Sequence, residues 1–318
     1  MNEYSVYTDL ALEAREIYAQ ENGQDHPGII VKEDKYEHSQ VTRVQLTTEE
    51  AARNLNKKIG NYITIESKEI RHNSKLIEKE ISQIIAQEIK NLIKVNENAT
   101  ILIVGLGNWN STPDSLGPKV IKHIFVTRHL QDYVPLEFKH KLRPTCAIAP
   151  GVLGITGMET GEIIKGIVER IKPELVLAID ALAARNLERL GTTIQIADTG
   201  IHPGSGLGSK RIGLTKETLG IPVIALGVPT VVHAGTIAYD TVEELLDNLT
   251  EVNTNQAFND LQISSIIEKI LAPYQDNLMV TPKEIDRLID DMSIIIANGI
   301  NSALHPKLDL EEVMKYFY

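Results

Sequence analysis

The chain has 318 residues, of which 42% are apolar and 24% are charged. These ordinary globular values exclude a disordered or fibrous protein. The 32 lysines and arginines stand against 43 aspartates and glutamates, which gives a net charge of −11. So acidic a chain is a poor general nucleic-acid binder, because neutralising phosphates requires clustered basic residues.

The single cysteine, Cys146, excludes an intrachain disulfide and a Cys-x-x-Cys zinc site, and it is typical of a reducing compartment. The sequence lacks the run of about 18 apolar residues that predicts a membrane helix. Residues 1–15 carry acidic side chains and no basic stretch followed by an apolar block, so we expect no signal peptide. The sequence therefore predicts a cytoplasmic protein with no membrane and no direct nucleic-acid partner.

In chain order, residues 1–38 are polar and broken by glycine and proline, which favours an N-terminal arm with one short helix over 10–20. Apolar patterning then predicts short strands, and isoleucines at helical spacing predict a long amphipathic helix. The strands are expected over 28–32, 41–46 and 62–66, and the helices over 49–58 and 74–94. Residues 28–95 thus form a β/α elaboration before the main sheet.

Three continuous apolar runs, at 100–107, 175–179 and 222–226, are typical of central parallel strands. Shorter strands are expected over 145–149 and 192–197, and helices over 116–130, 160–171 and 181–189. This alternation predicts an α/β fold with an open, mostly parallel twisted sheet flanked by helices. The carboxyl ends of parallel strands meet at one edge of such a sheet, where ligands usually bind.

After Tyr239 the sequence is mostly helical, so 241–318 is expected to be a helical C-terminal part. Its helices are predicted over 241–248, 259–271, 282–304 and 309–316, with Thr281 and Pro282 starting the third. The sequence has no internal repeat and no low-complexity tract. We therefore expect one α/β domain with elaborations at both ends, not two domains.

The first central run ends in Gly105-Leu-Gly107, which invites a dinucleotide-binding interpretation. The third glycine of that fingerprint is replaced by Asn110, so a tight turn at a strand end is favoured. Asp114 follows in the next loop, and Asp180 follows another apolar run. Each could simply cap a helix. Two aspartates from different strands at one edge could instead form a paired-carboxylate site, in which shared protonation lets one act as base and the other as acid.

A second loop, residues 198–211, also follows a strand. Its Asp-Thr-Gly start copies the aspartic protease tripeptide, but those proteases are all-β with two copies, so the match carries little weight. The glycines, His202, Lys210 and Arg211 could hold an anion or a peptide backbone, or form a plain surface loop. His233 could join Asp114 and Asp180 in a metal site, although a lone histidine is more often structural.

Several longer stretches resemble one family, the germination or spore proteases of endospore-forming bacteria. The matching segments are YSVYTDLALEA at 4–14, VGLGN at 104–108, TPDSLGP at 112–118, AIDALAAR at 178–185, DTGIHPGSG at 198–206, LGIPVIA at 219–225 and NLMVTPKE at 277–284. They cover nearly the whole chain. The span 249–260 is shorter than the corresponding insertion in that family.

The resemblance implies an endopeptidase that degrades small acid-soluble spore proteins during germination, in the forespore and spore core. It implies a fold similar to that of hydrogenase maturation proteases, a zymogen and a homotetramer. The two essential aspartates of the family fall on Asp114 and Asp180. The self-processing bond falls between Asp9 and Leu10, so residues 1–9 would be a propeptide and 10–318 the peptidase domain. No cofactor is carried over.

On this basis we expect Asp114 and Asp180 to activate water without a metal. Gly105, Asn108, His202 and Gly204 are expected to bind substrate or stabilise the oxyanion through nearby amides. Two alternatives stay open at this stage. One is a metal-dependent endopeptidase of the hydrogenase-maturation type, with His202 or His233 as the histidine ligand. The other is a non-catalytic module that binds a small anion at the same edge.

Overall fold

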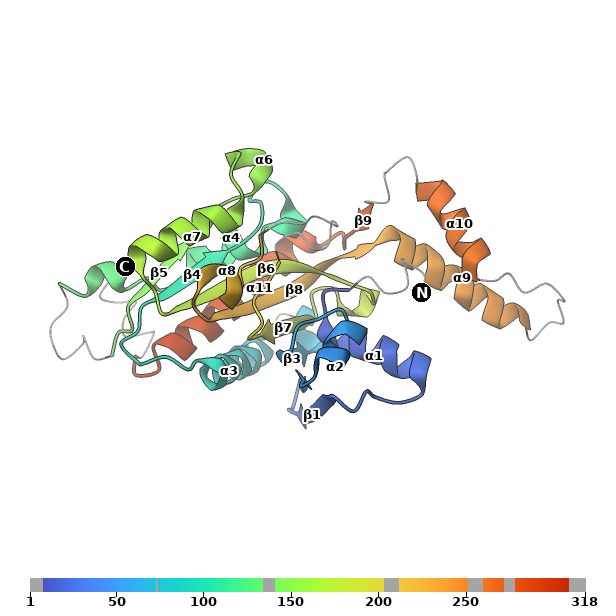
Figure 1. The fold of residues 1–318 in the computed structure, drawn as a ribbon, viewed down its shortest axis with the longest axis horizontal. Coiled ribbons are helices and arrows are strands. Elements are labelled where there is room, and N and C mark those ends of the chain that lie inside the picture. Colours follow the sequence, from blue (N-terminus) through green and yellow to red (C-terminus); the bar gives the residue numbers. More distant parts are fainter. Residues whose placement is uncertain are drawn as a thin grey trace.

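The computed structural model describes residues 8–72, 74–133, 141–202, 212–250, 260–271 and 278–308. Within these residues a single sheet of nine strands runs in the order β1-β2-β3-β7-β8-β6-β4-β5, with β9 paired to β8 (Figure 1). The open α/β sheet predicted from the sequence is confirmed. Only part of the sheet is parallel, however. The rest is antiparallel, and the two parts meet at β8, which pairs parallel with β6 and antiparallel with β7.

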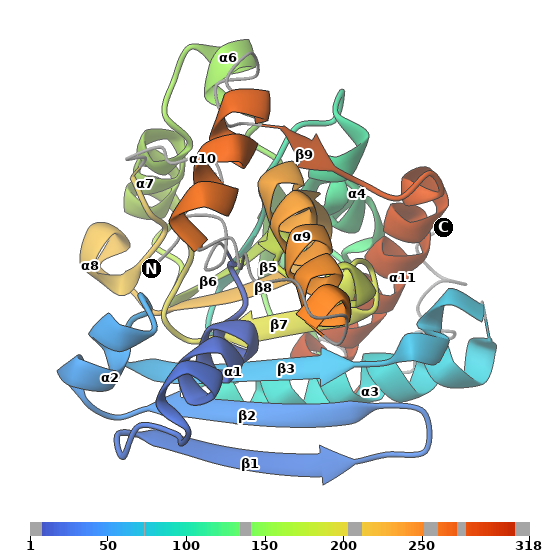
Figure 2. The ribbon, with the colours of Figure 1, turned by 90° about the vertical axis from the view of Figure 1, so that its right-hand side faces the viewer.

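The parallel part contains β8 (Val223–His233), β6 (Leu175–Ala184), β4 (Ile101–Gly105) and β5 (Thr145–Ile148). The antiparallel part adds β1 (Ile29–Lys35), β2 (Gln40–Leu46), β3 (Gly60–Glu66) and β7 (Thr193–Ala197) (Figure 2). These strands follow one another through connections too short for a crossover helix, so they pair antiparallel. The mostly parallel expectation thus holds for the central strands alone.

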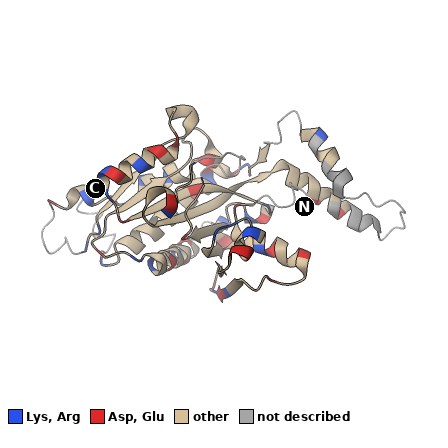
Figure 3. Cartoon of the chain, in the orientation of Figure 1, with Lys and Arg blue, Asp and Glu red and all other residues tan. Residues whose placement is uncertain are grey.

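Helices cover both faces of the sheet. On one face α3 (Lys75–Leu92), α4 (Leu116–His123) and α11 (Ile285–Leu304) bury an isoleucine-rich core against the central strands. On the other face α7 (Thr160–Ile171) and α8 (Lys216–Leu219) cover the central strands. There α1 (Ala11–Asn22) and α2 (Glu49–Asn54) pack over β2 and β3. Lys and Arg alternate with Asp and Glu along the outer surface of α7 (Figure 3).

The remaining elements are short or lie at one end. They are the 3-10 helices η1 (Lys68–His72), η2 (Thr112–Asp114), η3 (Arg128–Leu130) and η4 (Leu187–Arg189), the helices α6 (Leu153–Thr156), α9 (Ala234–Thr250) and α10 (Asp260–Leu271), and the strand β9 (Met279–Val280). Helices α9 and α10 pack on each other at the end of β8 (Figure 1). No helix in the described parts is long and apolar enough to cross a membrane.

Three sequence predictions about elements are wrong. The expected helix over 181–189 is instead the second half of β6, which runs through Asp180 to Ala184. The expected helix over 116–130 ends at His123. Helix α11 begins at Ile285, not at Pro282, and the Thr281 hydroxyl donates to the Thr230 carbonyl of β8 at 2.8 Å. The helix predicted over 309–316 lies outside the described residues.

Candidate active site

Asp180 lies in the middle of β6 rather than at its end, and only 7% of its surface is exposed. Its strand partner is Gly227 of β8, and Gly227 pairs in turn with Gln195 of β7. Residues paired across a sheet project from the same face. Asp180 and Gln195 therefore flank a position without a side chain, on the face that carries α1 and α7.

Asp114 ends η2, in the loop that follows β4, and this short helix lies against β6 and β8. The Asn108 N–H donates to the Asp114 carbonyl at 2.8 Å. Gly107 has a φ of +110°, and a Cβ there would lie 2.0 Å from the same carbonyl oxygen. Glycine is therefore required for the loop to fold this closely. The segments that carry Asp114 and Asp180 are thus in contact, and η2 also lies against α11. The pairing of the two carboxylates stays a prediction.

The other predicted site residues have different surroundings. The amide after Gly105, that of Leu106, donates to the Ile179 carbonyl at 2.8 Å, so it is already used within the sheet and does not serve as an oxyanion donor here. Asn108 shapes its own loop, since its Oδ1 accepts from the Asn110 N–H. Gly204, Lys210 and Arg211 lie outside the described residues.

The two histidines are far apart. His202 lines a cavity described below, and partial burial together with the Lys58 ammonium lowers its pKa. His233 lies six positions beyond Gly227 on β8, about 20 Å along the strand, and its Nδ1 accepts from the Gly235 N–H. His233 is therefore not a neighbour of Asp180, and a site joining the two is not formed.

Within the described residues, one group of three brings potential metal-ligating atoms within 4.8 Å of one another. It consists of Glu37 and His38 from the turn between β1 and β2 and Glu80 from α3, and it does not include Asp114 or Asp180.

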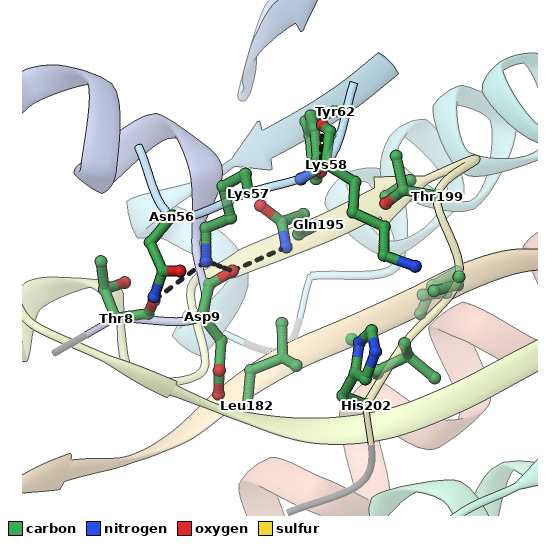
Figure 4. Close-up of a pocket in the computed structure, with 16 residues that line it drawn as sticks. Thr8, Asp9, Asn56, Lys57, Lys58, Tyr62, Leu182, Gln195, Thr199 and His202 are labelled. Atoms are coloured by element: carbon green, nitrogen blue, oxygen red, sulfur yellow. Dashed lines mark hydrogen bonds between the residues drawn. The ribbon is translucent and has the colours of Figure 1, made fainter. Parts of the chain in front are cut away.

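A cavity of about 430 Å³ opens on the face of the sheet where Gln195 and Gly227 lie (Figure 4). Its walls come from four strands, from the loop after α2 and from the N-terminal segment. The lining residues are Thr8, Asp9, Asn56, Lys57, Lys58, Tyr62, Leu182, Gln195, Ala197, Thr199, Gly200, Ile201, His202, Ala225, Leu226 and Gly227.

The sequence predicts that the N-terminal segment is an arm. In the structure this segment is instead bound along β6. The Asp9 N–H donates to the Ala183 carbonyl at 3.0 Å, and the Ala183 N–H donates to the Asp9 carboxylate at 2.8 Å. Leu10 is fully buried against a small apolar cluster that includes Leu182 and Leu190. Ala11 is also fully buried, at the start of α1.

Further along, Glu13 fixes the segment by its carboxylate, which is 3% exposed. It accepts hydrogen bonds from the backbone N–H groups of Arg185 and Asn186 at 2.8 and 2.9 Å. The Thr8 hydroxyl also donates to it, and Arg189 lies 3.4 Å away. Residues 8–13 are thus held at both ends, by acidic side chains bound to the end of β6 and the backbone beyond it.

Two side chains point at the backbone carbonyl of Asp9. Lys57 Nζ lies 3.1 Å from this oxygen and 3.0 Å from the Thr8 carbonyl oxygen. Gln195 Nε2 lies 3.1 Å from the Asp9 oxygen, while Gln195 Oε1 accepts from the Ala11 N–H at 2.7 Å (Figure 4). Burial lowers the pKa of Lys57, and the carboxylates of Asp9 and Glu13 oppose that shift.

Comparison with known proteins shows which family the chain belongs to. The sequence profile of the germination proteases, peptidase family A25, matches residues 8–265 and 257–317. The germination protease of Clostridium tetani is 48% identical over 320 residues, covering 98% of this chain and 99% of the relative. That of Clostridium perfringens strain 13 is 49% identical over 322 residues, with the same coverage of both. That of Bacillus subtilis is 42% identical over 360 residues, covering 99% and 98%.

The chain belongs to the germination protease family. It is therefore an endopeptidase that acts in spore germination, and the alternative of a non-catalytic anion-binding module is set aside. Among solved structures, the [NiFe] hydrogenase maturation protease HycI of Thermococcus kodakarensis is similar, with 16% identity and a TM-score of 0.29. That match covers 66% of this chain and 98% of the other.

Sequence reasoning pointed to the two aspartates and the N-terminal segment but not to Lys57 and Gln195, which line the cavity. Neither lies in a recognisable motif. Lys57 points into the cavity because α2 ends in a Schellman motif, with Asn56 at φ +50° and the Lys57 N–H donating to Ala52. Gln195 is the only amide side chain in β7, TIQIA, and it lies between two isoleucines, which is the one signal that could have identified it.

Proposed function

We propose that this chain degrades small acid-soluble spore proteins by an aspartate-pair mechanism and is made as a zymogen that cuts its own Asp9–Leu10 bond. One observation carries the proposal. The bond that the family resemblance marks for cleavage lies in the cavity, bound to Ala183 on the strand that holds Asp180. The main chain around Asp9 and Leu10 is thus held as a substrate would be.

The pair would work by sharing one proton. Two carboxylates close together in a poorly hydrated site do not both ionise easily, so one stays protonated. The ionised member of the Asp114 and Asp180 pair takes a proton from a water molecule while the oxygen of that water bonds to the Asp9 carbonyl carbon. The protonated member then donates to the Leu10 nitrogen as the C–N bond breaks. The products are a new carboxyl group on residue 9 and an amine on residue 10.

The side chains around the bond favour a substrate with an acidic residue followed by an apolar and then a small one. The acidic side chain is bound by the Ala183 N–H, and Leu10 fills an apolar pocket. Ala11 is fully enclosed, which leaves no space for a larger side chain. We propose that spore-protein substrates take these positions after residues 1–9 have left, in a homotetramer in the spore core.

Replacing the aspartates tests the mechanism. Asp114→Asn and Asp180→Asn keep the side-chain volume and remove the charge, so each should lower cleavage of a small acid-soluble spore protein by several orders of magnitude with the fold intact. Asp25→Asn, which breaks an ion pair with Arg15 at the surface, is the matched control. Circular dichroism checks folding. Near-normal cleavage by either active-site variant would remove that aspartate from the mechanism.

Chelation separates this mechanism from the metal-dependent alternative. We expect cleavage to continue unchanged after exhaustive dialysis against EDTA. Loss of activity that one added divalent metal restores would establish the metal-dependent mechanism instead.

A further inference from the structure

The carbonyl oxygen of Asp9 has two donors from separate elements. Lys57 comes from the loop after α2, and Gln195 from β7, and both approach to 3.1 Å. Donors at about 2.7–3.1 Å from a reacting oxygen are the geometry that stabilises an oxyanion. The carbonyl they share belongs to the peptide bond proposed for cleavage. The two donors are therefore placed to stabilise charge on this oxygen as well as to hold the segment.

We propose that Lys57 and Gln195 form the oxyanion site of this protease. The inference rests on the proposed cleavage of the Asp9–Leu10 bond and adds the groups that polarise its carbonyl. When the oxygen of water bonds to the carbonyl carbon, the electron pair of the C=O double bond moves onto this oxygen. The Lys57 ammonium and the Gln195 amide donate to that negative charge until the C–N bond breaks and the double bond returns.

Each donor is fixed before the reaction. The Schellman end of α2 holds the backbone of Lys57, and the same ammonium also donates to the Thr8 carbonyl. Gln195 is 8% exposed, and its Oε1 accepts from the Ala11 N–H, which orients its Nε2 toward Asp9. Donors that need not reorganise when charge develops give the largest rate effects.

Gln195 and Asp180 lie at the same level of the sheet, on strands either side of β8. Gln195 and Asp180 both pair with Gly227, which places their backbones about 10 Å apart across three strands. A side chain at 227 would collide with Leu182, since a Cβ there would lie 2.5 Å from Leu182 Cγ. A carbonyl held by Gln195 therefore lies on the same face of the sheet as the carboxylate expected to activate water.

Three variants of the full-length chain test the oxyanion site by the first-order rate of Asp9–Leu10 cleavage. Gln195→Glu keeps the size and the acceptor for Ala11 but removes the donor, and Lys57→Met removes the ammonium. Each should slow the reaction by about 10²–10³-fold. Lys57→Arg keeps a cationic donor and should recover part of the rate.

Matched controls account for the change in charge. Lys307→Met removes a surface ammonium whose partner is Glu97, and Gln45→Glu adds a carboxylate on an exposed position of β2. Both should stay within about threefold of the parent. Thermal unfolding checks that Gln195→Glu and Lys57→Met remain folded.

A second readout separates an oxyanion role from a merely structural one. Cleavage in trans of a peptide with the sequence of residues 4–16, by chains made without residues 1–9, gives kcat and KM separately. The proposal predicts that kcat falls in Gln195→Glu and Lys57→Met while KM changes little. A rise in KM with kcat unchanged would show that the two residues only hold the segment, and would overturn the proposal.

The same rate measurements distinguish failure of the oxyanion site from failure of the aspartate pair. Parental rates in Gln195→Glu and Lys57→Met, beside an inactive Asp180→Asn, would overturn the oxyanion site and leave the aspartate pair standing. The reverse pattern would overturn the aspartate pair alone. If the parent does not cut its own chain, kcat on the peptide decides the oxyanion site by itself.

Discussion

Single glycines determine how closely the Asp114 loop packs on the strands. Gly107 lies in the left-handed region, and the Asp114 carbonyl occupies the space where a Cβ would be. Replacing Gly107 should therefore affect activity more than stability, because this glycine sets where Asp114, which we propose to be catalytic, lies.

Gly107→Ala tests this reasoning. The strained backbone should cost about 1–3 kcal/mol of the free energy of unfolding. Displacing η2 by about 1 Å should lower kcat by about 10²-fold. Gly166→Ala on α7 is the control, since no atom lies within 4 Å of its added Cβ and alanine favours a helix by up to about 1 kcal/mol. Denaturant unfolding and peptide cleavage measure both variants. Full activity in Gly107→Ala would show that the loop has room to move.

Leu10 and Ala11 test whether the N-terminal segment is bound as a substrate. Leu10→Lys places an ammonium in an apolar pocket, at a cost of several kcal/mol, so self-cleavage should slow by at least about 100-fold. Ala11→Trp overfills an enclosed position and should act similarly. The segment should leave the cavity while the rest of the chain stays folded. Leu76→Lys, at a position of α3 that is 73% exposed, is the control and should cleave normally.

Among the elements, β6 shows what local sequence could and could not predict. The run from Leu175 to Ile179 predicts a buried strand because all its residues are apolar. Residues 181–184, Ala-Leu-Ala-Ala, favour a helix by propensity, yet they pair with β8 from Val228 to Val232. Tertiary pairing overrides local preference here. Asp9 binds to Ala183 in this second half of β6. Because the sequence predicted a helix there, it gave no indication that the N-terminal segment binds along β6.

The end of α11 should make stability depend on pH. Burial lowers the pKa of His305 to about 4, with Arg143 adding to the shift and the Phe125 backbone opposing it. An unfolded histidine titrates near pH 6.5, so the unfolded chain binds more protons between about pH 6.5 and 4. This part of the stability is complete above that window and is lost as the pH falls through it.

His305→Leu measures that contribution. The free energy of unfolding of the parent should fall by about 2 kcal/mol more than that of the variant between about pH 7.5 and 5. Denaturant titrations at the two pH values provide the comparison. An equal fall in both proteins would mean that His305 is not the group responsible.

In the whole molecule, the N-terminal segment joins parts that are distant in sequence. Residues 8–13 contact Lys57 before β3, the end of β6 and Gln195 on β7. Asp114, Asp180 and the Asp9–Leu10 bond could be proposed from the sequence because family motifs surround them, and their roles stay predictions. Lys57 and Gln195 could not, because their role depends on the antiparallel joining of β3, β7 and β8, which local patterning does not specify.

The cleavage of the Asp9–Leu10 bond tests the central claim most directly. The full-length chain is incubated at mildly acidic pH, which favours a singly protonated aspartate pair, and its products are identified by intact mass and N-terminal sequencing. The account predicts a single new chain that starts at Leu10, and none from Asp114→Asn or Asp180→Asn under the same conditions. A start site outside Thr8–Leu12, or the same product from either asparagine variant, would contradict it.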